Sequence, residues 1–229
     1  MTASSSAISD VITVVGSAYF QPIADLIETL LSRPAPAAYP AGTSGRENGY
    51  SASIIVLLVA LLESYTARLR FTRNGDLETA GKATPELLAE YFPDLPKREE
   101  LVEVFLLRNL VVHNHIWHLD VSDFEAAGAC TLATPKELGF QTNKHYDAVV
   151  DVAGRRTRKL GLHASPTSVD RSDAKVVFEV VWNTLTFMKS KSVSDTPLAV
   201  CKVGYAGKFR QFDELIQEFS RAQGNPDAP

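Results

Sequence analysis

The stretch Leu101–His118, LVEVFLLRNLVVHNHIWH, predicts a central helix that ends in a cluster of polar side chains. Between Val104 and Val112 every residue is apolar except Arg108 and Asn109. A helix that is apolar on nearly all sides is expected to be buried. Because a buried guanidinium needs a partner that offsets its charge, the stretch predicts a site rather than packing alone.

Three histidines follow Arg108 closely: His113, His115 and His118. On a regular helix Asn109 and His113 share a face, whereas Arg108 and His113 point about 140° apart. Two arrangements would bring the latter two together. Either the helix unwinds near Asn114, or a second copy of the helix completes the site in a two-fold dimer. The apolar surroundings favour the dimer.

The segment Arg108–His113, RNLVVH, resembles the Arg-x(4–6)-His motif of the HEPN superfamily, a group of small helical domains that includes many RNases. His115 fits the same motif as Arg-x(6)-His. A long helix carrying one acid precedes the motif and another long helix follows it, so the resemblance covers residues 51–115 and 172–190. It implies a homodimer whose interface forms the active site. Such proteins often act as toxins with a cognate antitoxin, or in phage defence.

The resemblance implies RNA cleavage without a metal or another cofactor. The ribose 2′-OH attacks the adjacent phosphate, a base removes its proton, and an acid protonates the 5′-oxygen. Histidine titrates near neutral pH, and arginine carries a permanent charge that matches phosphate oxygens. We assign proton transfer to His113, with His115 as its substitute. We assign to Arg108 the stabilisation of the negative charge on the phosphate, and to Asn109 an orienting role.

Glu63 is the first acid in the apolar helix that precedes the motif. Such a carboxylate needs a cationic partner, and Arg108 is the natural one. In that pair Glu63 would orient the guanidinium toward RNA. Two simpler interpretations stay open. One is a plain interhelical salt bridge, and the other is a helix end where Arg108 and His113 face the negative end of the helix dipole.

The dense basic run of the chain consists of Arg155, Arg156, Arg158 and Lys159. On a hairpin near the site it would hold RNA phosphates and offset the acidic balance of the whole chain. A solvated turn explains the same residues equally well. The other two histidines, His145 and His163, are isolated in the sequence and are expected on the surface.

Zinc binding is a further interpretation of the histidine cluster. The three histidines offer imidazoles, and Asp120 or Asp123 offers carboxylate oxygens. No cysteine lies close enough in the sequence to complete a usual zinc set. We therefore assign no metal, and we interpret His118 as the start of a strand.

The composition is that of an ordinary globular protein, with 229 residues and a net charge of −4. This balance excludes a broad basic coat, so any RNA contact is expected to be local. Cys130 and Cys201 form no metal or disulfide pattern, which is typical of a reducing cytosol. The N-terminus does not have the pattern of a signal peptide, and the apolar run Ile54–Leu62 is too short to span a bilayer. We expect a cytoplasmic protein without membrane contact.

Helical spacing predicts a mainly α fold, a bundle of five or six helices in a single domain over residues 1–229. The expected helices are Ala7–Leu31, Tyr50–Arg73, a short helix from Thr84, one from near Pro96, Ser172–Ser190 and one from about Gly207 to Ala222. The segment 33–49 is rich in proline and glycine and is expected to be a loop.

After His118 the pattern changes. The segment Ile116–Phe124 alternates partly, as a strand does. Tyr146–Ala153 and Arg156–Leu162 are expected to be strands that flank a hairpin turn. The region 119–170 therefore predicts a small β-containing insertion between two bundle helices. Leu198–Val203 is expected to be extended.

The function predicted from the sequence is a metal-independent endoribonuclease that acts on RNA as a homodimer. The alternative is a non-catalytic HEPN-like bundle that binds a nucleotide, RNA or a protein partner. RNA cleavage in excess EDTA distinguishes these two functions. A metal-binding protein is a third alternative, which stoichiometric zinc in purified material would reveal.

Overall fold

The computed structural model describes residues 15–36, 43–73, 81–113, 118–120, 131–133, 146–151, 153–192, 196, 198 and 201–224. In this part of the chain the α-helices are α1 (Phe20–Leu31), α2 (Gly45–Thr72), α3 (Thr84–Tyr91), α4 (Arg98–Val112), α6 (Tyr146–Val149), α7 (Arg171–Lys191) and α8 (Leu215–Gly224). Antiparallel pairs join β1 (His118–Asp120) to β2 (Thr131–Ala133), β3 (Val150–Asp151) to β4 (Arg156–Thr157), and β5 (Lys202–Tyr205) to β6 (Lys208–Gln211). The predicted class, a mainly helical bundle with a small β insertion, is confirmed.

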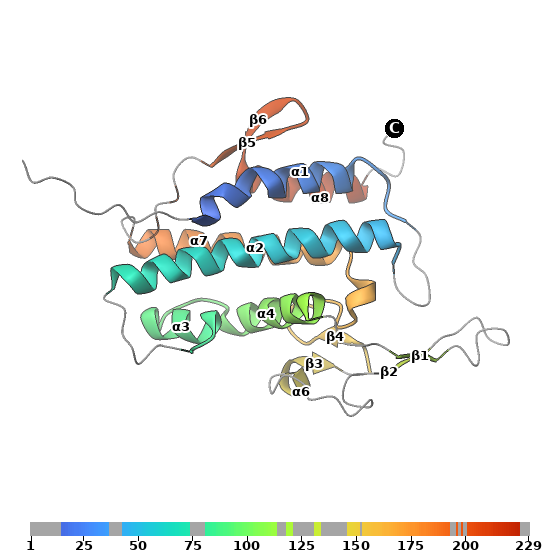
Figure 1. The fold of residues 1–229 in the computed structure, drawn as a ribbon, viewed down its shortest axis with the longest axis horizontal. Helices are drawn as coiled ribbons and strands as arrows, with labels where there is room; N and C mark the ends of the chain where they lie inside the picture. The colour runs from blue at the N-terminus through green and yellow to red at the C-terminus, as the bar shows by residue number, and fades with distance from the viewer. Residues whose placement is uncertain are drawn as a thin grey trace, which may run out of the picture.

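Helix α2 is the centre of the bundle (Figure 1). Figure 1 shows α1 on one side of α2, α4 on the other and α7 behind it. The inward side chains of α2 are fully buried, among them Ile54, Ile55, Leu58, Leu61 and Leu62. Burial stabilises the fold by roughly 1.5–3 kcal/mol for each such side chain. The core therefore explains most of the apolar content of this helix.

Helix α2 begins five residues before the predicted Tyr50, inside the segment expected to be a loop. The hydroxyl of Ser44 caps the helix by accepting a hydrogen bond from the backbone N–H of Glu47 at 3.3 Å. The loop prediction for residues 45–49 was therefore wrong. Its glycines were interpreted as helix breakers, whereas a serine N-cap and an acid in the first turn favour a helix start.

A buried ion pair joins the first turns of α2 and α7. The side chains of Glu47 and Arg171 are each 5% exposed. Arg171 donates to Glu47 from its backbone N–H at 3.0 Å, from Nε at 2.8 Å and from Nη2 at 2.7 Å. Its guanidinium also donates to the backbone oxygens of Leu30 and Arg33, at 3.4 and 3.3 Å. This pair therefore ties the end of α1 to the starts of two other helices.

The N-terminal helix is shorter than predicted within the described residues. A 3₁₀ turn, Val15–Tyr19, precedes α1, which starts at Phe20. Gly16 lies so close to α2 that an added Cβ would sit 2.8 Å from Cβ of Ser64. The backbone N–H of Gly16 donates to the Ser64 hydroxyl at 2.8 Å. The glycine thus lets the chain cross α2 closely, and residues 7–14 lie outside the described part.

Helix α4 begins at Arg98 and ends at Val112, with His113 as its C-cap. Of the stretch Leu101–His118 that predicted a helix ending in a polar cluster, the helix covers residues to Val112, and β1 begins at His118. That position confirms His118 as a strand start. The short helix α3 starts at Thr84 as predicted. Helix α7, Arg171–Lys191, confirms the helix predicted at Ser172–Ser190.

The insertion contains the predicted hairpin in reduced form. Strands β3 and β4 pair antiparallel, with Val150 opposite Thr157 and Asp151 opposite Arg156. The prediction that a strand begins at Tyr146 was wrong, because Tyr146–Val149 is helical. Tyr146, Val150 and Ala164 form a small apolar cluster with Leu106 and Leu110 of α4. This cluster holds the insertion against the outer side of α4.

The carboxylate of Glu103 anchors the turn after β4. Glu103 is 1% exposed and accepts hydrogen bonds from the backbone N–H groups of Lys159 and Leu160, both at 2.9 Å.

Replacing Glu103 by alanine is expected to destabilise the protein by about 2–4 kcal/mol, because two N–H groups lose their acceptor. Urea unfolding measures this loss. The matched control is Glu99→Ala, which removes an exposed ion pair with Lys159 and is expected to leave stability nearly unchanged. Equal effects of the two variants would contradict the anchoring role.

The C-terminal region differs from the prediction. The helix expected from about Gly207 begins at Leu215, because β5 and β6 form a hairpin before it. Ala206 and Gly207 have φ angles of 49° and 71°, the left-handed region that tight two-residue hairpin turns require. The side chain of Gln21 completes the edge of β5 by accepting from the N–H of Gly204 at 2.8 Å and donating to its carbonyl at 3.0 Å.

Helix α2 is also the one described helix that is long and apolar enough to cross a membrane. Half of its most apolar 18-residue window is buried in the protein. The central helix of a bundle has the same length and composition, so this property is weak evidence for a membrane span.

Candidate functional site

Glu63 of α2 and Arg108 of α4 form an ion pair and hydrogen bond through Oε1 and Nη2, as the sequence predicted. The side chain of Arg108 is 21% exposed and that of Glu63 is 39% exposed. The pair therefore lies at the rim of the core, where a ligand in solvent can reach it. This exposure departs from the expectation of a fully buried guanidinium.

The guanidinium of Arg108 is held from a second side by an aromatic ring. Its Cζ lies 5.5 Å from the ring centroid of Phe105, one turn earlier on α4. Its Nε is buried and has no hydrogen-bond partner among the described residues. The group is thus fixed in orientation by Glu63 and Phe105 while part of its side chain stays exposed. An anion is the ligand that such a group accepts best.

Asn109 and His113 lie one turn apart at the end of the same helix. The backbone N–H of His113 donates to the carbonyl of Asn109 at 3.0 Å, and His113 is exposed. Since α4 is helical through Val112, Arg108 and His113 remain about 140° apart around its axis. The helix does not unwind between them, so unwinding does not bring them together. His115 lies outside the described residues.

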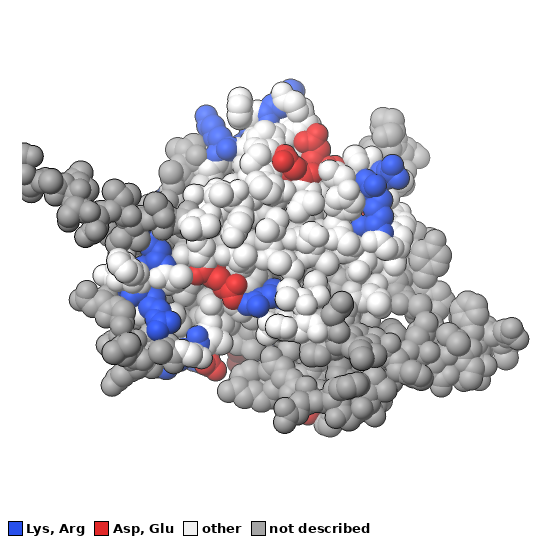
Figure 2. All heavy atoms as spheres, in the orientation of Figure 1, with Lys and Arg blue, Asp and Glu red and all other residues white. Residues whose placement is uncertain are grey.

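A shallow apolar groove lies beside the end of α4. It has a volume of about 400 Å³ and is lined by Ala52, Ser53, Val56, Leu57, Val111 and Val112. Val112 is 46% exposed although it is apolar. Figure 2 shows that the surface over α1 and α2 carries few charged side chains. Such a surface is typical of a protein–protein contact.

The basic run does not converge on Arg108 as a unit. Lys159 pairs with Glu99 in the first turn of α4 at 2.9 Å, and this hydrogen bond raises the pKa of Lys159. Glu99 and His113 are 14 positions apart, about 21 Å along a helix. Lys159 therefore lies at the opposite end of α4 from His113. Arg155 and Arg158 lie in the same hairpin region, half-buried and exposed respectively.

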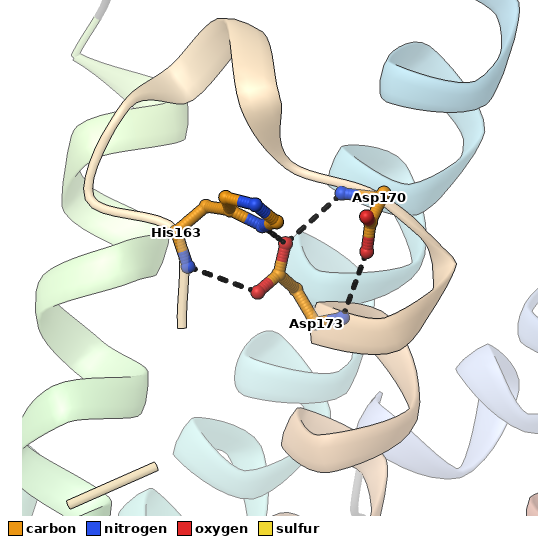
Figure 3. Close-up of side chains that lie close together, drawn as sticks. All are labelled: His163, Asp170 and Asp173. Atoms are coloured by element: carbon orange, nitrogen blue, oxygen red, sulfur yellow. Dashed lines mark hydrogen bonds and ion pairs between the residues drawn. The ribbon is translucent and has the colours of Figure 1, made fainter. Parts of the chain in front are cut away.

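Arg156 contacts a histidine that the sequence did not connect with it. Arg156 Nη2 lies 2.8 Å from Nε2 of His163, and Nη1 donates to the carbonyl of Gly161 at 2.7 Å. Nδ1 of His163 lies 2.8 Å from the carboxylate of Asp173, at the start of α7. Figure 3 shows the ring of His163 beside this carboxylate. The expectation that His163 is an isolated surface residue was therefore wrong.

This cluster was missed because its members belong to different local elements. Asp173 follows His163 by ten positions, and Arg156 precedes it by seven. The one local signal is the capping box of α7, in which Asp170 and Asp173 each bond to the other's backbone N–H. A capping box predicts a helix start. It does not predict that the second carboxylate also holds a histidine.

His163, Asp170 and Asp173 place potential metal ligands within 4.8 Å of one another. The atoms that would bind a metal already take part in hydrogen bonds. Asp173 accepts N–H bonds on both oxygens, and Asp170 Oδ1 accepts from the backbone N–H of Ser172 at 2.8 Å. The geometry is that of a helix cap, and we assign no metal to it.

Comparisons of the chain with protein-family models, with curated proteins and with solved structures find no match. The similarity to HEPN domains therefore remains a resemblance carried by Arg108, His113 and the order of the helices.

Proposed function

We propose that this protein is a metal-independent endoribonuclease of the HEPN type that acts as a homodimer. The observation that supports it most is the Glu63–Arg108 pair. A guanidinium on the motif helix is oriented by a carboxylate from the preceding long helix, yet it stays accessible to a ligand. By the same resemblance, a toxin or phage-defence role with a protein antitoxin is part of the proposal.

The proposed reaction uses groups from two chains. The 2′-hydroxyl of the ribose attacks the adjacent phosphorus, and the bond from phosphorus to the 5′-oxygen breaks. The products are a 2′,3′-cyclic phosphate and a free 5′-hydroxyl. His113 transfers the proton, and Arg108 stabilises the charge on the phosphate oxygens. Since the two residues diverge on one helix, Arg108 of one copy works with His113 of the other.

The groove beside Val112 is the surface that we assign to the dimer. It lies next to His113 and is lined by apolar and small side chains of α2 and α4. Pairing of this groove with its copy buries apolar surface that the single chain leaves exposed. It also brings the two ends of α4 toward each other, which the composite site requires.

RNA cleavage in excess EDTA tests the proposed function. We expect wild-type protein to cleave single-stranded RNA under these conditions and His113→Ala to lower the rate at least about 100-fold, the usual range for a lost acid or base. Folding is checked by circular dichroism. A wild-type protein that cleaves no RNA of a random-sequence pool, but retains it on a filter, would favour the non-catalytic binding function.

The dimer is tested at Val112. Val112→Glu is expected to weaken self-association at least about 30-fold, because a charge enters an apolar contact. Light scattering over a concentration series measures the change. Phe209→Glu is the matched control, since Phe209 is 84% exposed on the β5–β6 hairpin. Wild type that is monomeric, or a dimer that Val112→Glu leaves intact, would contradict this assignment of the interface.

A further inference from the structure

His163 lies between a buried carboxylate and an exposed guanidinium. Asp173 is 2% exposed and accepts three hydrogen bonds, from His163 N–H at 3.0 Å, from His163 Nδ1–H at 2.8 Å and from the N–H of Asp170 at 3.0 Å. These bonds fix the carboxylate and, through it, the imidazole. Figure 3 shows the arrangement between the loop and the first turn of α7. The ring is therefore preorganised, with one nitrogen left for other partners.

The hydrogen bonds determine which nitrogen carries the proton. A carboxylate accepts only, so Nδ1 of His163 is the donor to Asp173. In the neutral ring Nε2 is then an acceptor, and it takes an N–H from Arg156 at 2.8 Å. When the ring is protonated, Nε2 becomes a donor that faces another donor. The two cations then repel each other, and an anion with at least two acceptor oxygens between them would accept an N–H from each.

The backbone holds these two donors side by side. Arg156 and His163 form an antiparallel bridge next to the β3–β4 hairpin, so their side chains leave adjacent backbones. Arg156 is exposed and is steadied by the carbonyl of Gly161. The side chain of His163 is 18% exposed. The ring nitrogen opposite Asp173 therefore contacts an exposed guanidinium, which can rearrange to admit a ligand.

We propose that Arg156 and His163 form a phosphate-binding site whose affinity depends on protonation of His163. One phosphate oxygen accepts Nε2–H of the imidazolium, and a second accepts an N–H of the guanidinium. Asp173 stabilises the imidazolium from the other side. The ligand class is a phosphate group, carried either as a phosphomonoester or as the phosphodiester of RNA.

The pH dependence follows from the groups that surround the ring. Within the described residues these are Asp170 and Asp173 at the start of α7, and Arg156 of β4. Binding takes up one proton at His163. Affinity is therefore expected to be higher at low pH than at high pH, because protonation of the ring adds a charge and a hydrogen-bond donor.

Inorganic phosphate is the first probe, and the full-length protein in EDTA is the sample. Long-range proton–nitrogen NMR of the His163 ring reports both its protonation and its contact with phosphate. Sulfate, whose charge does not change in this range, is measured beside phosphate, and we expect it to bind at least about tenfold tighter at pH 6 than at pH 8. Arg156→Ala is expected to weaken binding at least about tenfold at pH 6, as loss of a charged hydrogen bond does. Arg158→Ala, an exposed arginine of the same run, is the matched control and is expected to change binding less than about twofold.

His163→Gln tests the proton linkage, because glutamine keeps a polar side chain but does not titrate. It is expected to abolish the pH dependence of sulfate binding. If this variant unfolds, Arg156→Ala carries the test, since Arg156 is exposed and its removal leaves the core intact. Affinity that is equal at the two pH values, or equal losses in Arg156→Ala and Arg158→Ala, would overturn the site.

Two further ligands identify the source of the phosphate. A nucleoside monophosphate presents a phosphomonoester, and a dinucleoside monophosphate presents only the phosphodiester of RNA. Preference for the former by at least about tenfold assigns the site to a terminal phosphate, whose second charge strengthens both contacts. The outcome is independent of RNA cleavage. If the protein binds phosphate at this site but cleaves no RNA, the phosphate-binding site is supported and only the proposed function is contradicted.

Discussion

Replacing Arg108 by alanine is expected to lower the rate of RNA cleavage at least about 100-fold, the loss typical of a group that stabilises transition-state charge. In the proposed reaction the phosphate gains charge as the 2′-oxygen attacks, and the partly exposed guanidinium of Arg108 lies beside Glu63 and Phe105 on the helix that carries the motif. The rate is measured with a fluorescent RNA substrate in EDTA, under conditions where substrate saturates the protein.

Two variants separate catalysis from stability at this position. Glu63→Gln retains a hydrogen-bond acceptor for Arg108 and is expected to lower the rate less than Arg108→Ala does. Arg98→Ala, at the exposed start of α4, is the matched control and is expected to leave the rate unchanged. Since the Glu63–Arg108 pair is partly exposed, its loss is expected to change the free energy of unfolding by only about 1 kcal/mol. An Arg108→Ala variant that is folded and fully active would remove the basis of the proposed function.

The largest effect on stability is expected for Arg171→Ala, which should lower the free energy of unfolding by about 3–5 kcal/mol. The substitution leaves the carboxylate of Glu47, 5% exposed, without the guanidinium that offsets its charge. It also removes the donors to the carbonyls at the end of α1. Urea unfolding followed by circular dichroism gives the measurement.

The same pair provides its own control. The double variant Glu47→Leu with Arg171→Met replaces two buried charges by apolar side chains, and it is expected to recover most of the lost stability. Arg221→Ala breaks an exposed pair with Glu218 and is expected to change stability by less than about 1 kcal/mol. If Arg171→Ala destabilises no more than Arg221→Ala does, the pair does not hold the three helices together.

The predicted elements that proved correct are those with long helical periodicity. The helices around Ile54–Leu62 and Leu101–Val112 were predicted from apolar stretches too long for an ordinary strand, and the helix around Val176–Met188 from helical spacing; all three are present. The Glu63–Arg108 pair was predicted for a related reason. A single acid and a single arginine among apolar neighbours have few other partners to choose from.

The errors arose where a few residues made a tertiary contact. Gly45 and Gly49 indicated a loop, but Ser44 and Glu47 start α2 there. The C-terminal helix was placed too early, because the turn at Ala206 and Gly207 was interpreted as part of a helix rather than a hairpin. In both places short local signals start the element, and contacts with distant residues, Arg171 and Gln21 respectively, hold it in position.

The sequence by itself determined that this protein is a helical bundle, and it placed an arginine and an acid on neighbouring core helices. The hydrophobic pattern of a helix is a local property of the sequence, so it can be recognised without a three-dimensional structure. Only the tertiary structure decided that His163 stands between Asp173 and Arg156. Those residues come from a loop, a helix cap and a strand, and their positions depend on how α4 and α7 hold the insertion. Contacts between such elements depend on packing across the whole chain, which no single stretch of sequence encodes.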